Sequence, residues 1–308
     1  MPYEIENKLV IGIASSALFN LAESDRIFRE KGREEYRKYQ IGNQDNTLGK
    51  GVAFPFVRRM LSLNDGFPDI EPVEVVLLSR NDPDTGLRVM NSIKSYGLNI
   101  TRSIFMSGKS PFAYIPAFNC SLFLSANPDD VKKAIDAGYP AGTVLEFSGE
   151  DDLNDKQLRV AFDFDGVIAD DESEAVYQES GDMDSFHKFE TDMAKIPHGP
   201  GPLQGLFKRL SSFQKMEAER TLEDPAYQPV LRTAIITARS APAHKRLITT
   251  LKEWGVSADE TLFIGGIEKR RFLEILKPHM FFDDQMKHLL PSASSTPSAH
   301  IPFGITNR

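Results

Sequence analysis

The sequence predicts an α/β protein made of two similar halves, each containing a parallel sheet. Two observations indicate this fold. Short apolar runs of strand length alternate with amphipathic helical segments, and the second half repeats the pattern of the first. The chain has 308 residues, 41% hydrophobic and 26% charged, which suits two domains of ordinary globular composition.

The predicted strands are continuous and rich in branched apolar residues, as expected of parallel strands covered on both faces. They are Leu9–Ile13, Val73–Leu78, Leu158–Phe162 and Thr233–Ile236. Helical segments such as Leu87–Tyr96 and His244–Trp254 lie between them. A glycine follows each of these two helices, Gly97 or Gly255, and glycine is a common helix terminator.

An internal repeat relates the two halves. A shift of 149 residues places Glu23-Ser24-Asp25 on Glu172-Ser173-Glu174 and Gly32 on Gly181. Further along the chain the shift is 158, which places residues 93–98 on 251–256, so the offset between the halves changes by only nine positions. We interpret this match as a duplication. The alternative is chance similarity between two α/β halves. A polar stretch near residue 150 then separates a first domain, 1–149, from a second, 150–308.

Composition narrows the class of function and the compartment. The net charge is −8, so the chain has no electrostatic reason to hold a nucleic-acid polymer. The single cysteine excludes an intrachain disulfide and fits a reducing compartment. No apolar run approaches the roughly 18 residues of a membrane span, and residues 1–8 do not resemble a signal peptide. We therefore expect a cytoplasmic protein with no membrane partner. The low-complexity segment Pro291–His300 is expected to be a surface coil.

Polar side chains follow four apolar runs of the second half. They are Asp163 and Asp165, then Thr237 and Arg239, which flank Ala238, then Lys269, and finally Asp283 and Asp284. The carboxyl ends of strands in an open parallel sheet are where ligands bind. Carboxylate oxygens suit Mg²⁺, a carboxylate can attack phosphorus, and a second acid can transfer protons. This set of residues favours magnesium-dependent phosphoryl transfer.

The four motifs resemble, in their order, those of haloacid-dehalogenase-type phosphatases. The resemblance implies two haloacid-dehalogenase-like repeats with Rossmann-like parallel sheets, of which the second is catalytic. It also implies that Asp163 is the nucleophile and Asp165 the general acid and base, while Thr237 and Lys269 hold the phosphoryl group. The metal ligands would be Asp163, the backbone carbonyl of Asp165, and one or both of Asp283 and Asp284.

A narrower resemblance covers nearly the whole chain. Residues 14–19, 78–88, 171–174, 237–242 and 282–285 are similar to segments of the cytosolic 5′-nucleotidase I family. That resemblance implies Mg²⁺-dependent hydrolysis of AMP and related nucleoside 5′-monophosphates. Ala238 and Arg239 would contact the substrate, and a helical cap at about 169–198 would cover the site. One departure is Phe164, where the family usually has glycine; its side chain is expected to point away from the metal.

The first half lacks this chemistry at the matching positions. Asp163 aligns with Ala14, Asp165 with Ser16, and Asp283-Asp284 with Ser125-Ala126, whereas Thr237 aligns with Ser79, and Lys269 aligns with Lys109 once two residues are inserted. The nucleophile and every metal carboxylate are therefore missing. We expect this half to serve as scaffold, as a wall of the substrate site, or as a regulatory site.

Several questions stay open at this stage. The substrate could instead be another small phosphomonoester, or the chain could be a nucleotide-sensing protein with incidental hydrolysis. Base preference and oligomeric state, including a homo-oligomer, are undetermined. The histidines show no metal-ligand spacing, and we expect them on the surface or on helix faces. They are His187, His198, His244, His279, His288 and His300.

Overall fold

The computed structural model describes residues 4–147 and 149–307. The chain forms two compact units, Met1–Val144 and Leu145–Arg308. Each unit contains a parallel sheet connected by helices, so the α/β class predicted from the sequence is confirmed. The sequence placed the boundary a few residues later, within the polar stretch that follows β7.

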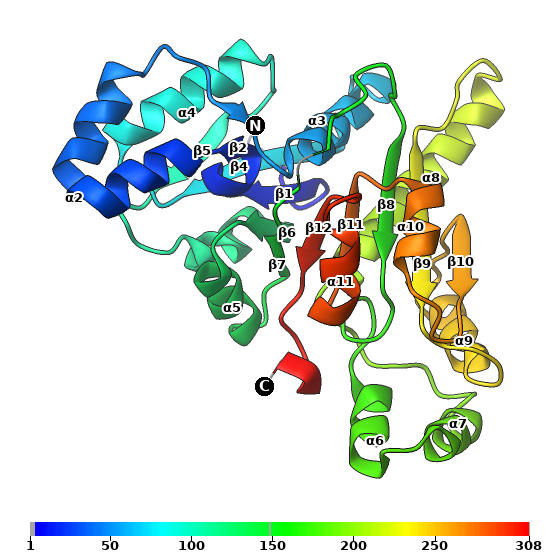
Figure 1. Ribbon diagram of the computed structural model, residues 1–308. Helices are drawn as coiled ribbons and strands as arrows, with labels where there is room; N and C mark the ends of the chain where they lie inside the picture. Colours follow the sequence, from blue (N-terminus) through cyan, green and yellow to red (C-terminus); the bar gives the residue numbers. More distant parts are fainter. Residues whose placement is uncertain (1–3, 148, 308) are drawn as a thin grey trace. The chain divides into compact units, whose positions relative to one another are not determined.

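Unit 1 has a five-stranded parallel sheet of order β5-β4-β1-β6-β7 (Figure 1). Its strands are β1 (Leu9–Ile13), β4 (Val73–Ser79), β5 (Arg102–Phe105), β6 (Cys120–Ser125) and β7 (Ala141–Val144). Its helices are α1 (Ser15–Leu18), α2 (Ala22–Gly42), α3 (Phe54–Ser62), α4 (Pro83–Ser95) and α5 (Pro128–Asp136). The short strands β2 (Phe19–Asn20) and β3 (Gly49–Lys50) form a separate antiparallel pair.

Unit 2 has a five-stranded parallel sheet of order β10-β9-β8-β11-β12 (Figure 1). Its strands are β8 (Leu158–Phe162), β9 (Leu231–Thr237), β10 (Glu260–Phe263), β11 (Met280–Asp283) and β12 (Ser298–His300). Its helices are α6 (Glu172–Ser180), α7 (Met183–Asp192), α8 (Gln204–Glu223), α9 (His244–Trp254), α10 (Arg270–Leu276) and α11 (Met286–Ser292).

The two units share one strand order when each is numbered from its own first strand. A shift of 149 residues places β1 on β8, and a shift of 158 places β4 on β9 and β5 on β10, end to end. The shifts are those that relate the two halves of the sequence. The four runs predicted as strands all form strands, because continuous branched apolar runs are buried in the middle of each sheet.

Glycine ends the two predicted helices as expected. Gly97 and Gly255 both adopt a φ of +66°, a left-handed conformation that side chains disfavour. Helix α9 has the predicted bounds, whereas α4 begins four residues before the predicted Leu87. The side chain of Asp82 causes the earlier start, because it accepts a hydrogen bond from the Thr85 amide at 2.9 Å and caps the helix.

The expectation of a surface coil at Pro291–His300 was wrong. The segment completes α11 and then forms β12, in which Ser298 and Ala299 are buried. Strand β12 pairs in parallel with β11, so its backbone groups find partners in the sheet rather than in water. Small residues carry little local strand signal, but they fit here because the neighbouring strand supplies the hydrogen bonds.

Each unit has its own apolar core around its central strands. Val10, Val76 and Phe123 belong to the core of unit 1, and Ala161, Ile236 and Phe281 to that of unit 2. No helix among the described residues has both the length and the apolar character needed to cross a membrane.

Candidate active site

The register of the unit 2 sheet brings its two acidic strand ends together. Phe162 of β8 pairs with Phe282 of β11, and the Asp163 amide donates to the Phe282 carbonyl at 2.8 Å. Asp163 therefore lies beside Asp283 at the carboxyl edge of the sheet. This is the edge at which open parallel sheets bind their ligands.

A buried lysine joins these two carboxylates. Lys269 precedes α10 and is 1% exposed. Its Nζ lies 2.9 Å from Asp163 Oδ1 and 2.6 Å from Asp283 Oδ2. The sequence predicted that a strand-end lysine and two strand-end acids would meet, and the structure brings these three residues together.

Three carboxylates crowd into one buried cluster. Oxygen atoms of Asp163, Asp283 and Asp284 all lie within 4.8 Å of one another. Burial, followed by the neighbouring negative charges, raises the pKa of Asp163 and of Asp284 above their ordinary values. Burial lowers the pKa of Lys269, but Asp163 and Asp283 raise it by more, so this lysine keeps its charge. Three ionised carboxylates would carry more negative charge than one lysine balances.

The cluster has the features of a divalent-cation site. Asp284 Oδ1 is buried and has no hydrogen-bond partner within the described residues. A buried oxygen of this kind normally has a partner, and a cation would supply one. Gly166 has a φ of +72°, and a Cβ there would come within 2.7 Å of Asp284 Cγ. Only glycine lets the chain pass this close to the carboxylate.

The other predicted strand end lies on the opposite side of β8. Phe162 pairs with Ile235 of β9, so Thr237 and the residues after it reach the same edge of the sheet as Asp163. Thr237 is buried, and its Oγ1 accepts a hydrogen bond from the Arg239 amide at 3.2 Å. Ala238 is exposed directly after the strand. The phosphoryl-binding role of Thr237 and the substrate role of Ala238 stay predictions.

Arg239 is paired with the predicted general acid. Its guanidinium donates to both carboxylate oxygens of Asp165, from Nε at 2.8 Å and from Nη2 at 2.6 Å. The arginine side chain is 2% exposed and that of Asp165 is 18% exposed. The sequence assigned Arg239 to substrate binding, whereas in this structure it holds Asp165. Its contact with substrate stays a prediction.

Arg239 belongs to a buried charge network that the sequence analysis missed. Its Nη1 donates to Glu190 of α7, which is fully buried and also accepts from Arg246 Nη1 at 3.1 Å. Burial raises the pKa of Glu190, but hydrogen bonding to His198 and the charge of Arg239 lower it by more, so the net pKa is about 2. The network therefore joins α7 to the loop after β9. Its members come from distant segments, and no local motif marks them.

Two histidines were placed wrongly on the surface. His198 is 3% exposed, and its Nε2 lies 3.1 Å from Arg239 Nη2. His279 is 8% exposed, and its Nδ1 accepts from the Arg159 amide at 3.0 Å. Burial lowers the pKa of His198, whereas Asp170 and Glu190 raise it by more, giving a net rise. Polar sequence context did not reveal these hydrogen-bond partners.

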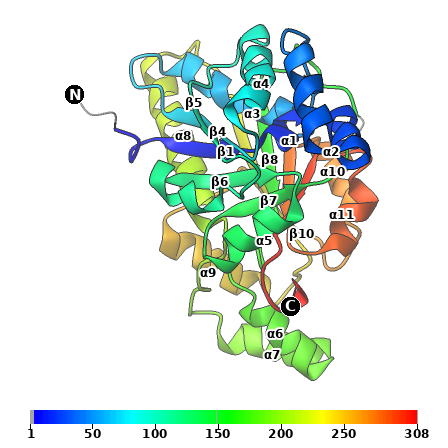
Figure 2. The same ribbon diagram turned by 90° about the vertical axis from the view of Figure 1, so that its left-hand side faces the viewer.

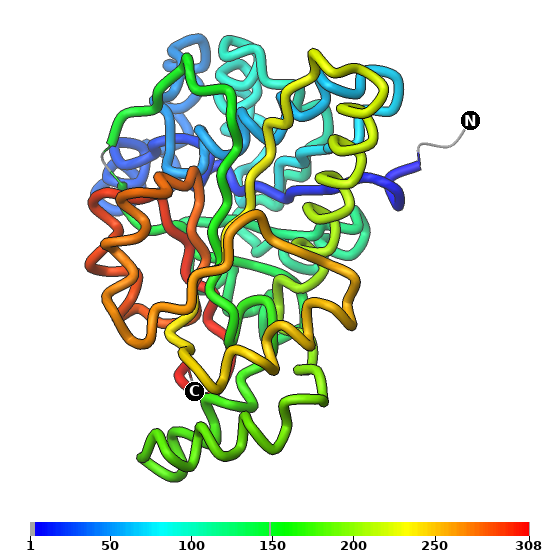
Figure 3. The backbone as a smooth tube through the Cα atoms, turned by 90° about the vertical axis from the view of Figure 1, so that its right-hand side faces the viewer, coloured from blue at the N-terminus to red at the C-terminus, as the bar shows by residue number. Residues whose placement is uncertain are grey.

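Helices α6 and α7 form the insert predicted as a cap. They follow β8 and lie beyond the carboxyl end of the unit 2 sheet (Figures 1 and 3). Phe186 lies 5.7 Å from the Arg239 guanidinium carbon and Phe189 lies 5.4 Å from that of Arg246. Phe164 is buried and its ring lies 5.4 Å from the His198 ring. These aromatic residues pack against the charge network.

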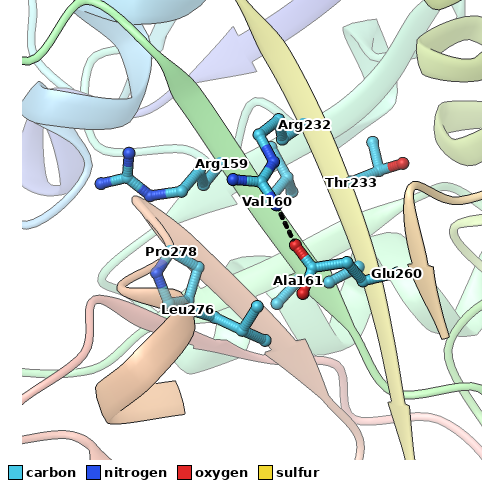
Figure 4. Close-up of a pocket in the computed structure, with 9 residues that line it drawn as sticks. Arg159, Val160, Ala161, Arg232, Thr233, Glu260, Leu276 and Pro278 are labelled. Carbon is cyan, nitrogen blue, oxygen red and sulfur yellow. Dashed lines mark hydrogen bonds and ion pairs between the residues drawn. The ribbon is translucent and has the colours of Figure 1, made fainter. Parts of the chain in front are cut away.

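Unit 2 has a small hollow away from these residues. It is lined by residues from the middle of β8 and the amino-terminal half of β9 and includes the Arg232–Glu260 ion pair (Figure 4). Its volume is about 10 Å³, close to the space of one water molecule. The candidate site is therefore the carboxyl edge of this sheet.

Comparison with known proteins identifies the family of this chain. A family model described as 5′-nucleotidase matches residues 1–308. Human cytosolic 5′-nucleotidase 1B is 36% identical over 297 residues, which cover 94% of this chain and 48% of that protein. The chain thus spans about half the length of this curated relative. No solved structure was found to match it. The expected family is confirmed: the chain belongs to the 5′-nucleotidase family of phosphomonoester hydrolases.

Proposed function

We propose that this chain is a Mg²⁺-dependent 5′-nucleotidase that hydrolyses nucleoside 5′-monophosphates such as AMP. The observation that carries the proposal is the buried cluster of Asp163, Asp283 and Asp284 around Lys269 at the carboxyl edge of the unit 2 sheet. We further propose that the two units are haloacid-dehalogenase-like repeats. Their common strand order and the end-to-end match of three strand pairs support this.

The reaction would proceed in two steps. A carboxylate oxygen of Asp163 attacks phosphorus, the bond to the 5′ oxygen breaks, and Asp165 gives that oxygen a proton to release the nucleoside. Asp165 then takes a proton from a water molecule, whose oxygen attacks the aspartyl phosphate. Phosphate leaves and the Asp163 carboxylate is restored.

Three groups would stabilise charge on the phosphoryl oxygens. Lys269 is held beside Asp163 and donates from Nζ, and Thr237 supplies a hydroxyl. A magnesium ion held by Asp163, the Asp165 carbonyl, and Asp283 or Asp284 would neutralise negative charge there. Asp284 Oδ1, buried and without a partner among the described residues, is the ligand atom that best supports this ion.

The proposed substrate class rests on the α6–α7 cap, which lies beyond the phosphate-binding groups, and on the similarity to the human relative. Every group named above acts on the phosphate end, so discrimination must come from the α6–α7 cap and from Ala238 and Arg239. The similarity to human cytosolic 5′-nucleotidase 1B supports a nucleotide substrate and a cytosolic location.

A panel of phosphomonoesters tests the proposal. AMP or another purine 5′-monophosphate should give a higher kcat/KM than sugar phosphates or p-nitrophenyl phosphate. Stacking on one aromatic side chain contributes about 0.5–1.5 kcal/mol, which corresponds to a roughly twofold to tenfold preference. ATP should react poorly. If sugar phosphates react faster than every nucleotide, the substrate is a sugar phosphate and the proposed nucleotide specificity is wrong. Tight AMP binding without turnover would indicate a nucleotide sensor.

A further inference from the structure

Unit 1 contains a hollow of about 400 Å³ on the same edge of its own sheet. Ligand pockets commonly measure about 300–1,000 Å³, so this hollow is large enough for a small metabolite. Residues after β4 and β5 line one side of it, and residues of α2 line the other. Helix α2 packs along α4 in this unit (Figure 2). The residues that matter below are Phe28, Arg33, Tyr36, Arg37, Arg80 and Asn81.

The position of this hollow in unit 1 corresponds to the position of the candidate active site in unit 2. Helix α2 breaks at Gly32, which has a φ of +80°, and the shift of 149 places that glycine on Gly181 between the cap helices, with a φ of +69°. Helix α2 therefore corresponds to the α6–α7 cap. Arg80 and Asn81 follow β4, as Ala238 and Arg239 follow β9.

The walls of this hollow carry groups that recognise phosphate. Three arginines and two aspartates line it. Arg80 is fixed by two hydrogen bonds to Asp130, the first from Nε at 2.7 Å, and its remaining N–H groups stay available as donors. Arg33 Nη2 lies 4.0 Å from Asp82, and Arg37 Nη2 is paired with Asp84, but their side chains are 66% and 45% exposed and keep further N–H donors. A planar guanidinium suits phosphate oxygens well.

The α2 wall also presents an aromatic surface. Phe28 is 51% exposed, which is unusual for phenylalanine, and its ring meets the edge of Tyr36 at 5.6 Å. The Tyr36 hydroxyl donates to Asn81 Oδ1 at 3.1 Å. Asn81 Nδ2 is buried and has no hydrogen-bond partner in the described part of the chain. An exposed ring beside an unpaired amide donor suits a planar heterocycle with acceptor atoms.

The hollow lacks the groups that hydrolysis needs. Ala14, Ser16, Ser125 and Ala126 stand where unit 2 has its four strand-end carboxylates. It therefore has neither the aspartate nucleophile nor the metal carboxylates, and a phosphate bound there would stay intact. We propose that this hollow is a second, non-catalytic binding site for a nucleoside 5′-monophosphate, and that it binds without Mg²⁺.

Equilibrium dialysis of labelled AMP against the full chain tests this site. In EDTA, the wild type should bind one AMP per chain, and Asp163→Asn should bind a second once Mg²⁺ is added. In EDTA, the double variant Arg33→Ala/Arg37→Ala should bind AMP at least about tenfold more weakly, since hydrogen bonds to two charged groups are lost. The matched control Arg26→Ala/Arg29→Ala removes the same charge from exposed positions of α2 outside the hollow.

Two further arms separate this site from the catalytic one. Binding in EDTA should persist in Lys269→Met, because that lysine belongs to the unit 2 cluster. Adenosine and inorganic phosphate should each compete more weakly than AMP, since each uses half of the site. No AMP bound in EDTA, equal loss in the two double variants, or loss in Lys269→Met would overturn the proposal. Absence of AMP hydrolysis would contradict the proposed function alone.

Discussion

The strand ends of the two units differ more than the sheets that carry them. In unit 2, three buried carboxylates share one lysine, and one of their oxygens has no partner among the described residues. In unit 1, the positions that match these carboxylates are uncharged, and the neighbouring hydroxyls are hydrogen-bonded: Ser15 Oγ lies 3.1 Å from Ser79 Oγ, and Ser125 Oγ accepts from the Asn127 amide at 3.0 Å. One sheet topology thus supports either a cluster of buried carboxylates or hydrogen-bonded hydroxyls at the matching strand ends.

Removing the proposed nucleophile should give the largest difference between the units. Asp163→Asn should lower AMP turnover by about 10⁴-fold or more, because an amide cannot form the aspartyl phosphate. Ser16→Ala and Lys109→Ala in unit 1 should stay within about twofold of the wild type at saturating substrate. Steady-state phosphate release measures all three. A hundredfold loss in a folded unit 1 variant would show that this unit takes part in the chemistry.

Stability should depend more on the arginine after β9 than on the one after β4. Arg239→Ala leaves Glu190 with one fewer cation in a fully buried setting, so it should destabilise unit 2 by about 3–5 kcal/mol. Arg80 is 36% exposed, and Arg80→Ala should cost unit 1 about 1–2 kcal/mol.

Each unit contains its own natural probe for this comparison. The single tryptophan, Trp254, reports the urea unfolding of unit 2 by fluorescence. The single cysteine, Cys120, is buried in unit 1, and burial raises the pKa of its thiol to about 12. This thiol should react with a maleimide only when unit 1 opens. Equal losses in the two variants would mean that the buried network adds no special stability.

The metal requirement should depend on unit 2 acids alone. Asp283→Asn/Asp284→Asn should raise the Mg²⁺ concentration for half-maximal activity by at least about tenfold, because two anionic ligands leave the site. Asp129→Asn, at an exposed position of α5, is the control and should leave it unchanged. EDTA should abolish wild-type activity, and added Mg²⁺ should restore it. Full activity in metal-free protein would contradict the proposed mechanism.

The two strand-end hydroxyls give the finest comparison. Thr237→Val keeps the shape of the side chain but removes the hydroxyl, so kcat/KM for AMP should fall by about tenfold to a hundredfold. Ser79→Ala removes the matching hydroxyl of unit 1, which is hydrogen-bonded within that unit, and kcat/KM should change by less than about twofold. Similar losses of kcat/KM in both variants would show that both hydroxyls contribute to the reaction.

The sequence by itself predicted the central strands β1, β4, β8 and β9, the glycines that end α4 and α9, and the similarity between its two halves. Continuous apolar runs and positive-φ glycines such as Gly97 and Gly255 act through local chemistry that can be read directly. The meeting of Asp163 with Asp283 was also predictable, because parallel strands that end in acids place those acids at one edge of the sheet.

Only the tertiary structure decided which partners the other polar groups take. Arg239 contacts Asp165 and Glu190, 74 and 49 residues away in the chain, and no local pattern specifies such pairs. Strand β12 forms although Ser298, Ala299 and His300 carry little local strand signal, because it pairs in parallel with β11. The hollow of unit 1 lies between α2, which breaks at Gly32, and the residues that follow β4 and β5. Contacts of this kind depend on packing between distant segments, which local sequence patterns do not record.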